Sequence, residues 1–280
     1  MTDSSSIPKR STPKRSIPNV LTIAGSDPSG GAGIQADLKT FSALGAYGTS
    51  VITALTAQNT RGVNGVHPVP ADFIATQLET LLDDVRIDAV KIGMVASLEV
   101  AEVIREALTR RRPRWVVLDP VMVAKSGDIL VDAIGIRAVR EVLVPLADLI
   151  TPNLPEAAVL LGLPAPVTRD EMQAMAPALR ALGAGGTLLK GGHLSGGECP
   201  DLLIGADAAV WVEGARVDTA NLHGTGCTLS SAITAHLAQG DSLHKAVAAA
   251  KAWLGEALAA SHRLDVGQGS GPVHHFHAWW

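Results

Sequence analysis

The chain has 280 residues, of which 47% are hydrophobic and 18% are charged, and its mean hydropathy is +0.24. This composition excludes a disordered protein, and the length is sufficient for a large α/β domain. A net charge of −4 and an aromatic content of 3% argue against a nucleic-acid-binding surface. No apolar run reaches the roughly 18 residues that a membrane helix needs. We therefore expect a cytoplasmic globular protein with no nucleic-acid or membrane partner.

The first 18 residues differ in composition from the rest of the chain. They are mostly Ser, Pro, Lys and Arg and contain no apolar stretch of secretory-signal length, so we expect a disordered tail. No repeat or Pro-rich linker divides the remainder, which predicts a single domain over residues 19–280. The two cysteines, Cys199 and Cys227, lie far apart without a CxxC pair. They indicate neither a disulfide framework nor a zinc site, and they favour a reducing compartment.

Short β-rich runs alternate with helical patterns from Asn19 onward, which is typical of βαβ units. The pattern predicts strands at 19–24, 49–57, 88–93, 114–118, 147–151 and 186–190. It predicts helices from the first Gly-rich turn to Ala43 and over 72–85, 97–111, 132–143 and 168–182. Short strands at 200–205, 208–213 and 215–219 and two Ala-rich helices at 225–238 and 242–261 complete the chain. We therefore expect an α/β fold with a mostly parallel central sheet and helices on both faces.

The first glycine-rich loop, at 25–33, follows the first strand. Its segment from Gly31 to Ala36 fits the loose dinucleotide-binding pattern. That pattern needs an acidic residue at the end of the second strand, where this chain has Gln58 and Asn59. The phosphate-loop pattern GxxxxGK[ST] is also absent from the sequence. Dinucleotide binding is therefore disfavoured, and any phosphate site must be built differently.

The second glycine-rich loop reads HGTGC from His223 to Cys227, at the predicted start of a helix. Free backbone N–H groups and the helix dipole attract an anion at such a position. Gly224 and Gly226 allow the backbone to approach that anion closely. Taken alone, the motif fits equally well an ordinary turn with a small buried cysteine.

Polar residues stand at the ends of three predicted strands. Asp119 follows one strand, Asn153 and Glu156 follow the next, and Lys190 ends a third. Carboxylate and amide oxygens suit a Mg²⁺-nucleotide, and a lysine at the end of an apolar strand suits a phosphate. Each residue has a structural alternative, because Asp119 can cap a turn and Asn153 with Glu156 can form a helix capping box. Together these positions predict phosphoryl transfer.

Eight segments in this order resemble one known family. They are AGSDPSGGAGIQADLKT at 24–40, GTSVITALTAQNT at 48–60, KIGMV at 91–95, LDPVMVAKSG at 118–127, TPNLPEA at 151–157, KGGH at 190–193, HGTGCTLSSAI at 223–233 and GPVHHF at 271–276. The chain from about Asn19 to its end closely resembles the bacterial hydroxymethylpyrimidine/phosphomethylpyrimidine kinases of thiamine biosynthesis. The resemblance implies a ribokinase-like three-layer sandwich, ATP with Mg²⁺, a homodimer, and two successive phosphorylations of 4-amino-5-hydroxymethyl-2-methylpyrimidine.

The resemblance also implies roles for residues that match the family motifs. Cys227 would lie beside the acceptor hydroxyl, and its position at a helix start beside Lys190 leads us to expect a favoured thiolate that acts as a base. The backbone of Gly224, Thr225 and Gly226 would form the anion hole. Asn153, Lys190 and Thr225 would bind ATP, and Asp119 and Glu156 would hold the metal. The pyrimidine pocket would consist of Gly25, Asp37, Gln58, Met94 and Val121.

The chemistry of the proposed pocket is reasonable, and several alternatives stay open. The Gln58 amide can meet the amino group and the adjacent ring nitrogen of an aminopyrimidine. Met94 and Val121 would cover the ring, although plain core packing explains them equally well. We reject a metal site at His193, His223 or the 274–277 histidine cluster and interpret Trp279 and Trp280 as anchors of the chain end. Rival functions are a pyridoxal-type kinase and a catalytically silent pyrimidine or nucleotide sensor.

Overall fold

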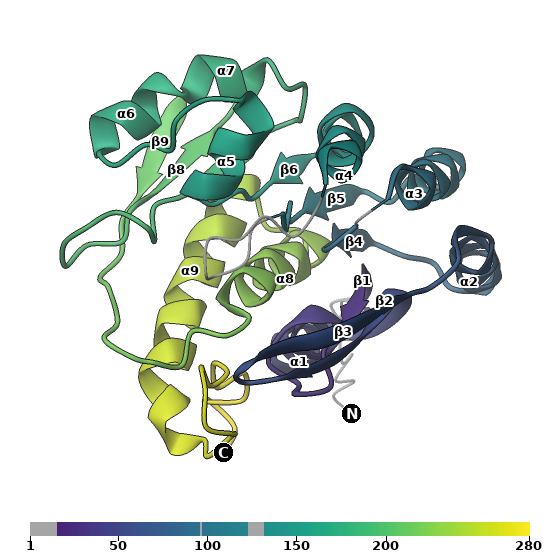
Figure 1. The fold of residues 1–280 in the computed structure, drawn as a ribbon, viewed down its shortest axis with the longest axis horizontal. Coiled ribbons are helices and arrows are strands. Elements are labelled where there is room, and N and C mark those ends of the chain that lie inside the picture. Colours follow the sequence, from purple (N-terminus) through teal and green to yellow (C-terminus); the bar gives the residue numbers. More distant parts are fainter. Residues whose placement is uncertain (1–15, 96, 123–131) are drawn as a thin grey trace, which may run out of the picture.

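The computed structural model describes residues 16–95, 97–122 and 132–280. At its centre lies a nine-stranded sheet (Figure 1). The strands are β1 Asn19–Ser26, β2 Tyr47–Asn59, β3 Gly62–Pro68, β4 Ala89–Ile92, β5 Trp115–Leu118, β6 Leu149–Ile150, β7 Thr187–Lys190, β8 Asp201–Ile204 and β9 Ala209–Val212. Their order is β3-β2-β1-β4-β5-β6-β7-β8-β9. The six strands from β2 to β7 in this order pair in parallel, and β3, β8 and β9 pair antiparallel at the edges.

Helices cover both faces of this sheet (Figure 1). They are α1 Gly33–Ala43, α2 Ala71–Asp84, α3 Leu98–Arg110, α4 Ala133–Ala138, α5 Leu154–Leu161, α6 Arg169–Ala174, α7 Ala176–Arg180, α8 Thr225–Ala238 and α9 Leu243–Ala259. Alternate strand residues point to opposite faces, so Val116 and Leu118 of β5 pack with α2, α3 and α4, whereas Val117 packs with α8 and α9. Helices α5, α6 and α7 bury their apolar residues against β7 and β8. The three-layer α/β architecture expected from the sequence is confirmed.

Two predicted elements need correction, and two were not predicted. Residues 215–219 form no strand, because the Arg216 guanidinium fixes this segment by donating to the carbonyls of Gly192 and Leu194 instead of a strand ladder. The helix expected over 168–182 is divided into α6 and α7 at Met175. The unpredicted elements are α5 and the exposed strand β3. Residues 1–15 of the expected tail and 123–127 of the LDPVMVAKSG motif lie outside the described residues.

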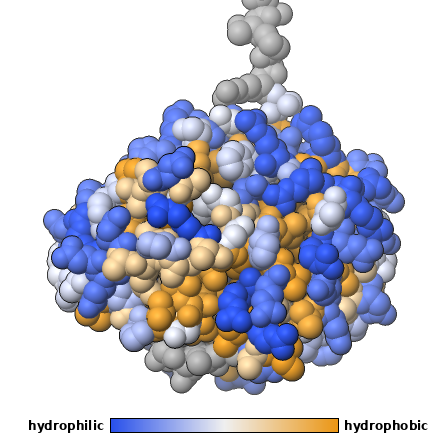
Figure 2. All heavy atoms as spheres, turned by 90° about the horizontal axis from the view of Figure 1, so that it is seen from above, coloured by the Kyte–Doolittle hydropathy of each residue, from blue (hydrophilic) through white to orange (hydrophobic). Residues whose placement is uncertain are grey.

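The surface of the described chain mixes apolar and polar side chains. On the face seen in Figure 2, hydrophobic residues reach the surface between hydrophilic ones, as is usual for folded proteins. Several large apolar side chains are exposed on β2, β3 and α2, among them Tyr47, Leu55, Val63, Val66 and Phe73. Within the described residues, we find no helix whose length and apolar character would allow it to cross a membrane.

Candidate active site

The two glycine-rich loops meet at the carboxyl end of the parallel strands. Gly224 caps α8 with a φ of +74°, and a Cβ at this position would lie 1.8 Å from the carbonyl oxygen of Gly31 in the first loop. A Cβ on Gly226 would lie 3.4 Å from Lys190 Nζ and 3.5 Å from Asp119 Oδ2. At position 224 only a residue without a side chain allows this approach, whereas a Cβ at position 226 would make ordinary van der Waals contacts with these two side chains. The start of α8 thus faces the ends of β5 and β7, as expected for open α/β sheets.

Lys190 is shared by the two carboxylates that the sequence singled out. Its Nζ lies 3.0 Å from Asp119 Oδ1 and 3.9 Å from Glu156 Oε2, and all three side chains are largely buried. Burial opposes the ionisation of Asp119, but the charges of Lys190 and Lys91 and the hydrogen bonds from Lys190 and Thr151 together outweigh burial and lower the pKa of this carboxyl. Burial raises the pKa of Glu156 to about 7, with Lys190 opposing and Asp119 adding to the shift. One lysine therefore compensates Asp119 well and Glu156 poorly.

Asn153 and Glu156 also form the capping box that the sequence left open. The Asn153 side chain accepts from the Glu156 N–H at 2.8 Å, and Glu156 Oε2 accepts from the Asn153 N–H at 2.8 Å. This reciprocal pair begins α5 and satisfies two backbone donors. Glu156 can still interact with Lys190 while it caps the helix, because a carboxylate has four acceptor sites. The box holds the carboxylate next to Lys190.

The residues present fit a magnesium ion. Mg²⁺ commonly uses one or two carboxylates together with water and substrate phosphates. Asp119 and Glu156 supply two carboxylates, and both lie within 4 Å of the single ammonium group of Lys190. In the described part of the chain, no group of three or more His, Cys, Asp and Glu side chains could hold a metal by itself. A cation here would share its ligands with a bound nucleotide.

The thiol of Cys227 does not have the character expected from the sequence. It is half-buried in the first turn of α8, and the backbone N–H of Gly33 donates to it. Burial raises the pKa of the thiol to about 11, although Lys91 acts in the opposite direction. The expectation of a favoured thiolate is therefore wrong for this structure, because burial outweighs the nearby positive charges.

Asp37 lies below the site and not at its surface. Its side chain is fully buried and forms an ion pair with Lys91, with Nζ–O distances of 2.9 and 3.0 Å. Thr22 Oγ1 and Ser231 Oγ donate to the same carboxylate at 2.6 and 2.7 Å. Asp37 connects α1 to β1, β4 and α8 through these contacts, and its role as a substrate contact stays a prediction. Ser231 is one helical turn beyond Cys227, so this cluster positions the start of α8.

The remaining predicted pocket residues surround the end of β1. A Cβ on Gly25 would lie 3.3 Å from Met94 Cε, and the Met94 carbonyl accepts from Thr53 Oγ1 at 3.1 Å. Met94 and Val121 are half-buried and lie outside the main hydrophobic clusters. Gln58, on the β2 side, is also half-buried and contacts His223 of the second loop at 3.4 Å. These side chains are therefore accessible enough to line a ligand pocket.

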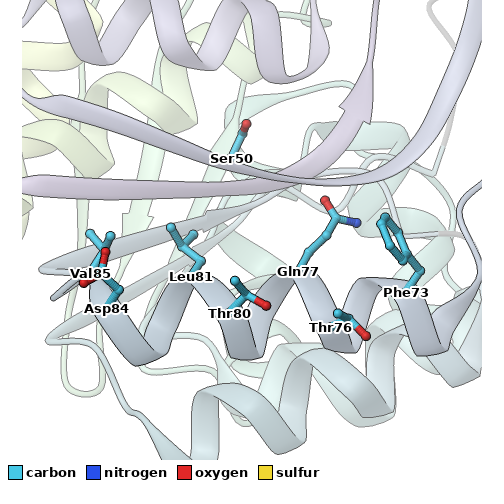
Figure 3. Close-up of a pocket in the computed structure, with 8 residues that line it drawn as sticks. All are labelled: Ser50, Phe73, Thr76, Gln77, Thr80, Leu81, Asp84 and Val85. Carbon is cyan, nitrogen blue, oxygen red and sulfur yellow. The ribbon is translucent and has the colours of Figure 1, made fainter.

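A separate groove lies between α2 and β2, away from this site (Figure 3). Its volume is about 460 Å³, and it is lined by Ser50 of β2 and a row of α2 side chains that point toward the strand. The Gln77 amide in this row bonds both the N–H and the carbonyl of Ile52, at 3.0 and 3.1 Å. None of the predicted site residues lines the groove, so we do not assign the chemistry to it.

Three residues of the site were not predicted. Lys91 is a charged residue inside an apolar strand, which is the same signal that pointed to Lys190. Asp27 and His223 form a contact of 2.8 Å between the two glycine-rich loops. They are 196 residues apart in the chain, and no spacing in the sequence indicates their contact.

Comparisons with known proteins identify the family of this chain. The sequence matches the family described as phosphomethylpyrimidine kinase over residues 27–274. It is 55% identical to the hydroxymethylpyrimidine/phosphomethylpyrimidine kinase of Salmonella typhimurium, covering 94% of this chain and 98% of that protein. The phosphomethylpyrimidine kinase structure from Clostridium difficile has a TM-score of 0.77 and 45% identity, covering 86% of this chain and 99% of that one. The ADP complex of Bacillus subtilis pyridoxal kinase has a TM-score of 0.87 and 38% identity, covering 94% and 99%. The chain belongs to the phosphomethylpyrimidine kinase family.

Proposed function

We propose that this protein transfers the γ-phosphoryl group of ATP to 4-amino-5-hydroxymethyl-2-methylpyrimidine and then to the resulting monophosphate, in thiamine biosynthesis. The observation that carries the proposal is the contact of the glycine-lined start of α8 with the Lys190–Asp119 pair, 3.0 Å apart. A helix N-terminus beside a lysine suits a transferring phosphoryl group. The half-buried side chains of Gln58 and Met94 offer a polar and an apolar contact to a pyrimidine ring.

The proposed division of labour follows the site geometry. The backbone of Gly224, Thr225 and Gly226 would stabilise negative charge on the transferring group, and the Lys190 ammonium would neutralise phosphate oxygens. Asn153 and Thr225 would contact ATP. Cys227, with its protonated thiol, would position the acceptor hydroxyl next to the anion hole. Positioning and electrostatic stabilisation supply most of the rate in such reactions, so a strong base is not required.

Asp119 and Glu156 would hold Mg²⁺ together with the nucleotide phosphates. Bound there, the ion would neutralise phosphate charge and orient the nucleotide. The proposal predicts that substituting Asp119 by Asn weakens the binding of Mg²⁺ in the presence of the nucleotide, so that a higher Mg²⁺ concentration is needed for activity. Calorimetric titration with Mg²⁺ and a non-hydrolysable ATP analogue would measure this directly.

A pyridoxal-type activity is the second candidate, favoured by the likeness to the Bacillus subtilis pyridoxal kinase structure. The higher identity to the Salmonella typhimurium enzyme favours the pyrimidine. A coupled assay of ATP consumption with hydroxymethylpyrimidine and pyridoxal as competing substrates tests the proposal. We expect a higher kcat/KM for the pyrimidine and formation of its diphosphate. Absence of turnover with both compounds would contradict the kinase assignment and favour a silent sensor.

The proposal extends to the assembly and location of the protein. We propose a cytoplasmic homodimer, supported by the exposed apolar side chains on β2, β3 and α2, such as Leu55, Val66 and Phe73. Light scattering on the eluting protein would give its mass in solution. A mass equal to one chain at micromolar concentration would refute the dimer.

A further inference from the structure

One ring nitrogen joins the two glycine-rich loops to the β2–β3 hairpin. His223 Nε2 lies 2.8 Å from Asp27 Oδ2 and 3.4 Å from Gln58 Nε2. The ring packs directly over Gly31, where a Cβ would lie 2.3 Å from His223 Cδ2. The backbone N–H of His223 donates to the carbonyl of Gly271 at 3.0 Å. The imidazole is thus held on several sides and cannot adapt freely to a ligand.

The proton on this ring is fixed by Asp27. Besides the His223 ring, its carboxylate accepts from the Ser29 N–H and hydroxyl at 2.8 and 2.9 Å and from the Ala32 N–H at 2.9 Å. Although burial opposes ionisation, these bonds lower the pKa of Asp27 to about 2. An ionised carboxylate can only accept hydrogen bonds. His223 Nε2 therefore carries a proton and donates a hydrogen bond to the Asp27 carboxylate.

The orientation of the Gln58 amide follows from the same reasoning. The structure places Gln58 Oε1 3.2 Å from Thr56 Oγ1, but the single hydroxyl proton of Thr56 is donated to the Ser26 carbonyl at 2.9 Å. Thr56 Oγ1 can then only accept, so this end of the amide must be its N–H₂ end. The other end of the amide lies 3.4 Å from His223 Nε2, whose one N–H is directed at Asp27 at 2.8 Å and can be shared with the amide only as a second, weaker acceptor. The two ends of an amide have the same shape, so hydrogen bonding decides which is which. Both contacts are favourable only with Gln58 Nε2 toward Thr56 and Oε1 toward His223.

We propose that His223, held by Asp27, is a positioning residue that fixes the Gln58 amide and thereby makes the site select an amino group over an oxo group on the pyrimidine. The inference rests on the proposed function, because it takes Gln58 to face the pyrimidine edge. A 4-aminopyrimidine presents an N–H donor beside a ring-nitrogen acceptor, whereas a 4-oxo analogue presents an acceptor beside an N–H donor. An amide that cannot turn matches the first pattern and opposes the second.

The experiment compares kcat/KM for the 4-amino substrate and its 4-oxo analogue in four proteins: the natural chain, His223→Leu, His223→Gln and His67→Leu. In the natural protein we expect a preference of at least about 100-fold for the amino compound, because the wrong pattern leaves buried polar groups unpaired. Removing the ring N–H in His223→Leu should reduce this preference at least tenfold. His223→Gln, whose amide N–H can take the place of Nε2–H, should restore it. His67→Leu changes an exposed histidine of β3 and should leave it unchanged.

The other outcomes test either the proposed kinase function or the positioning role of His223. Failure of the natural protein to phosphorylate the amino compound would refute the proposed function. Turnover without a preference, or a preference that survives in His223→Leu, would overturn the role of His223. In a Gln58→Leu background, His223→Leu should cause no further loss of preference, and an additive loss would also overturn it. If His223→Leu does not fold, Thr56→Val removes the acceptor at the other amide end and should lower the preference in the same way.

Discussion

The buried Asp37–Lys91 pair makes the strongest test of how this site is supported. Both side chains have 0% exposure, so neither charge can be solvated if its partner is removed. Lys91→Met keeps the length of the side chain but leaves the Asp37 carboxylate with only the hydroxyls of Thr22 and Ser231 as donors. Breaking a buried pair in this way typically costs about 3–5 kcal/mol of unfolding free energy. We expect a loss of that size for Lys91→Met and for Asp37→Asn.

The double variant should be much more stable than the sum of the single losses predicts. Asn at position 37 can bond both neighbouring hydroxyls, and Met at position 91 packs without a charge, so no unpaired ion stays in the interior. Urea unfolding of all four proteins gives the coupling energy of the pair, which we expect to exceed about 2 kcal/mol. Arg110→Met provides the control, because the exposed Arg110–Glu79 pair should contribute less than about 1 kcal/mol. Additive losses would refute the reasoning.

The same double variant tests the position of Asp37 relative to the substrate. If Asp37 only supports α8, the double variant should recover the KM for the pyrimidine together with its stability. If Asp37 contacts the substrate, the KM will stay raised in a stable protein. Steady-state kinetics in which the pyrimidine and ATP are each varied in turn separate these two results, because global damage would change the KM for ATP as well.

Three further predictions concern the site itself. Because burial raises the pKa of Glu156 to about 7, the folded protein holds this proton longer than the unfolded chain does, and stability without Mg²⁺ should fall by up to about 3 kcal/mol as the pH rises from about 4.5 to 7. The dependence of the urea unfolding midpoint on pH across this range should become weaker in Glu156→Gln, and an unchanged pH dependence would refute the raised pKa of Glu156. Gly226→Ala keeps the backbone N–H but places a methyl group 3.4 Å from Lys190 Nζ, where the transferring phosphoryl group would lie, and should lower kcat at an unchanged melting temperature by excluding that group; wild-type kcat would show that the anion hole lies elsewhere. Cys227→Ala should slow both phosphorylation steps by the same factor in single turnovers, since a thiol with a pKa of about 11 is a poor base, and selective loss of the first step would restore the base role.

The sequence predicts the parallel core of the fold well because its strands are short apolar runs bounded by helical patterns. The predicted helix over 225–238 coincides with α8. Strand β3 escapes prediction because all seven of its residues are exposed and it contains two glycines and a proline, so it shows no alternation of apolar and polar side chains. Its existence depends on pairing with β2, which is a tertiary contact.

Some residues of the site can likewise be identified from the local sequence, whereas the roles of others depend on contacts that are distant in the chain. Asp119 and Lys190 are recognisable because each ends an apolar strand, and parallel strands end at one edge of the sheet. The role of Asp37 is not recognisable, because its burial depends on Lys91 in β4 and Ser231 in α8. The pKa of Cys227 likewise depends on how completely the surrounding chain excludes water. A helix start alone favours the thiolate, but its desolvation in the folded protein outweighs that effect.

The charges around the start of α8 explain why a nucleotide should reach this site together with a divalent cation. Lys91 is neutralised by Asp37 at 2.9 Å, and Lys190 is largely neutralised by Asp119 at 3.0 Å. Glu156 lies 3.9 Å from the same lysine, and burial together with the neighbouring Asp119 raises its pKa to about 7 against the opposing effect of Lys190. A polyphosphate that approached alone would meet an excess negative charge, whereas one accompanied by Mg²⁺ would supply the missing positive charge. Protons and Mg²⁺ then compete for Glu156, so the affinity for the ion should rise as the pH passes through about 7.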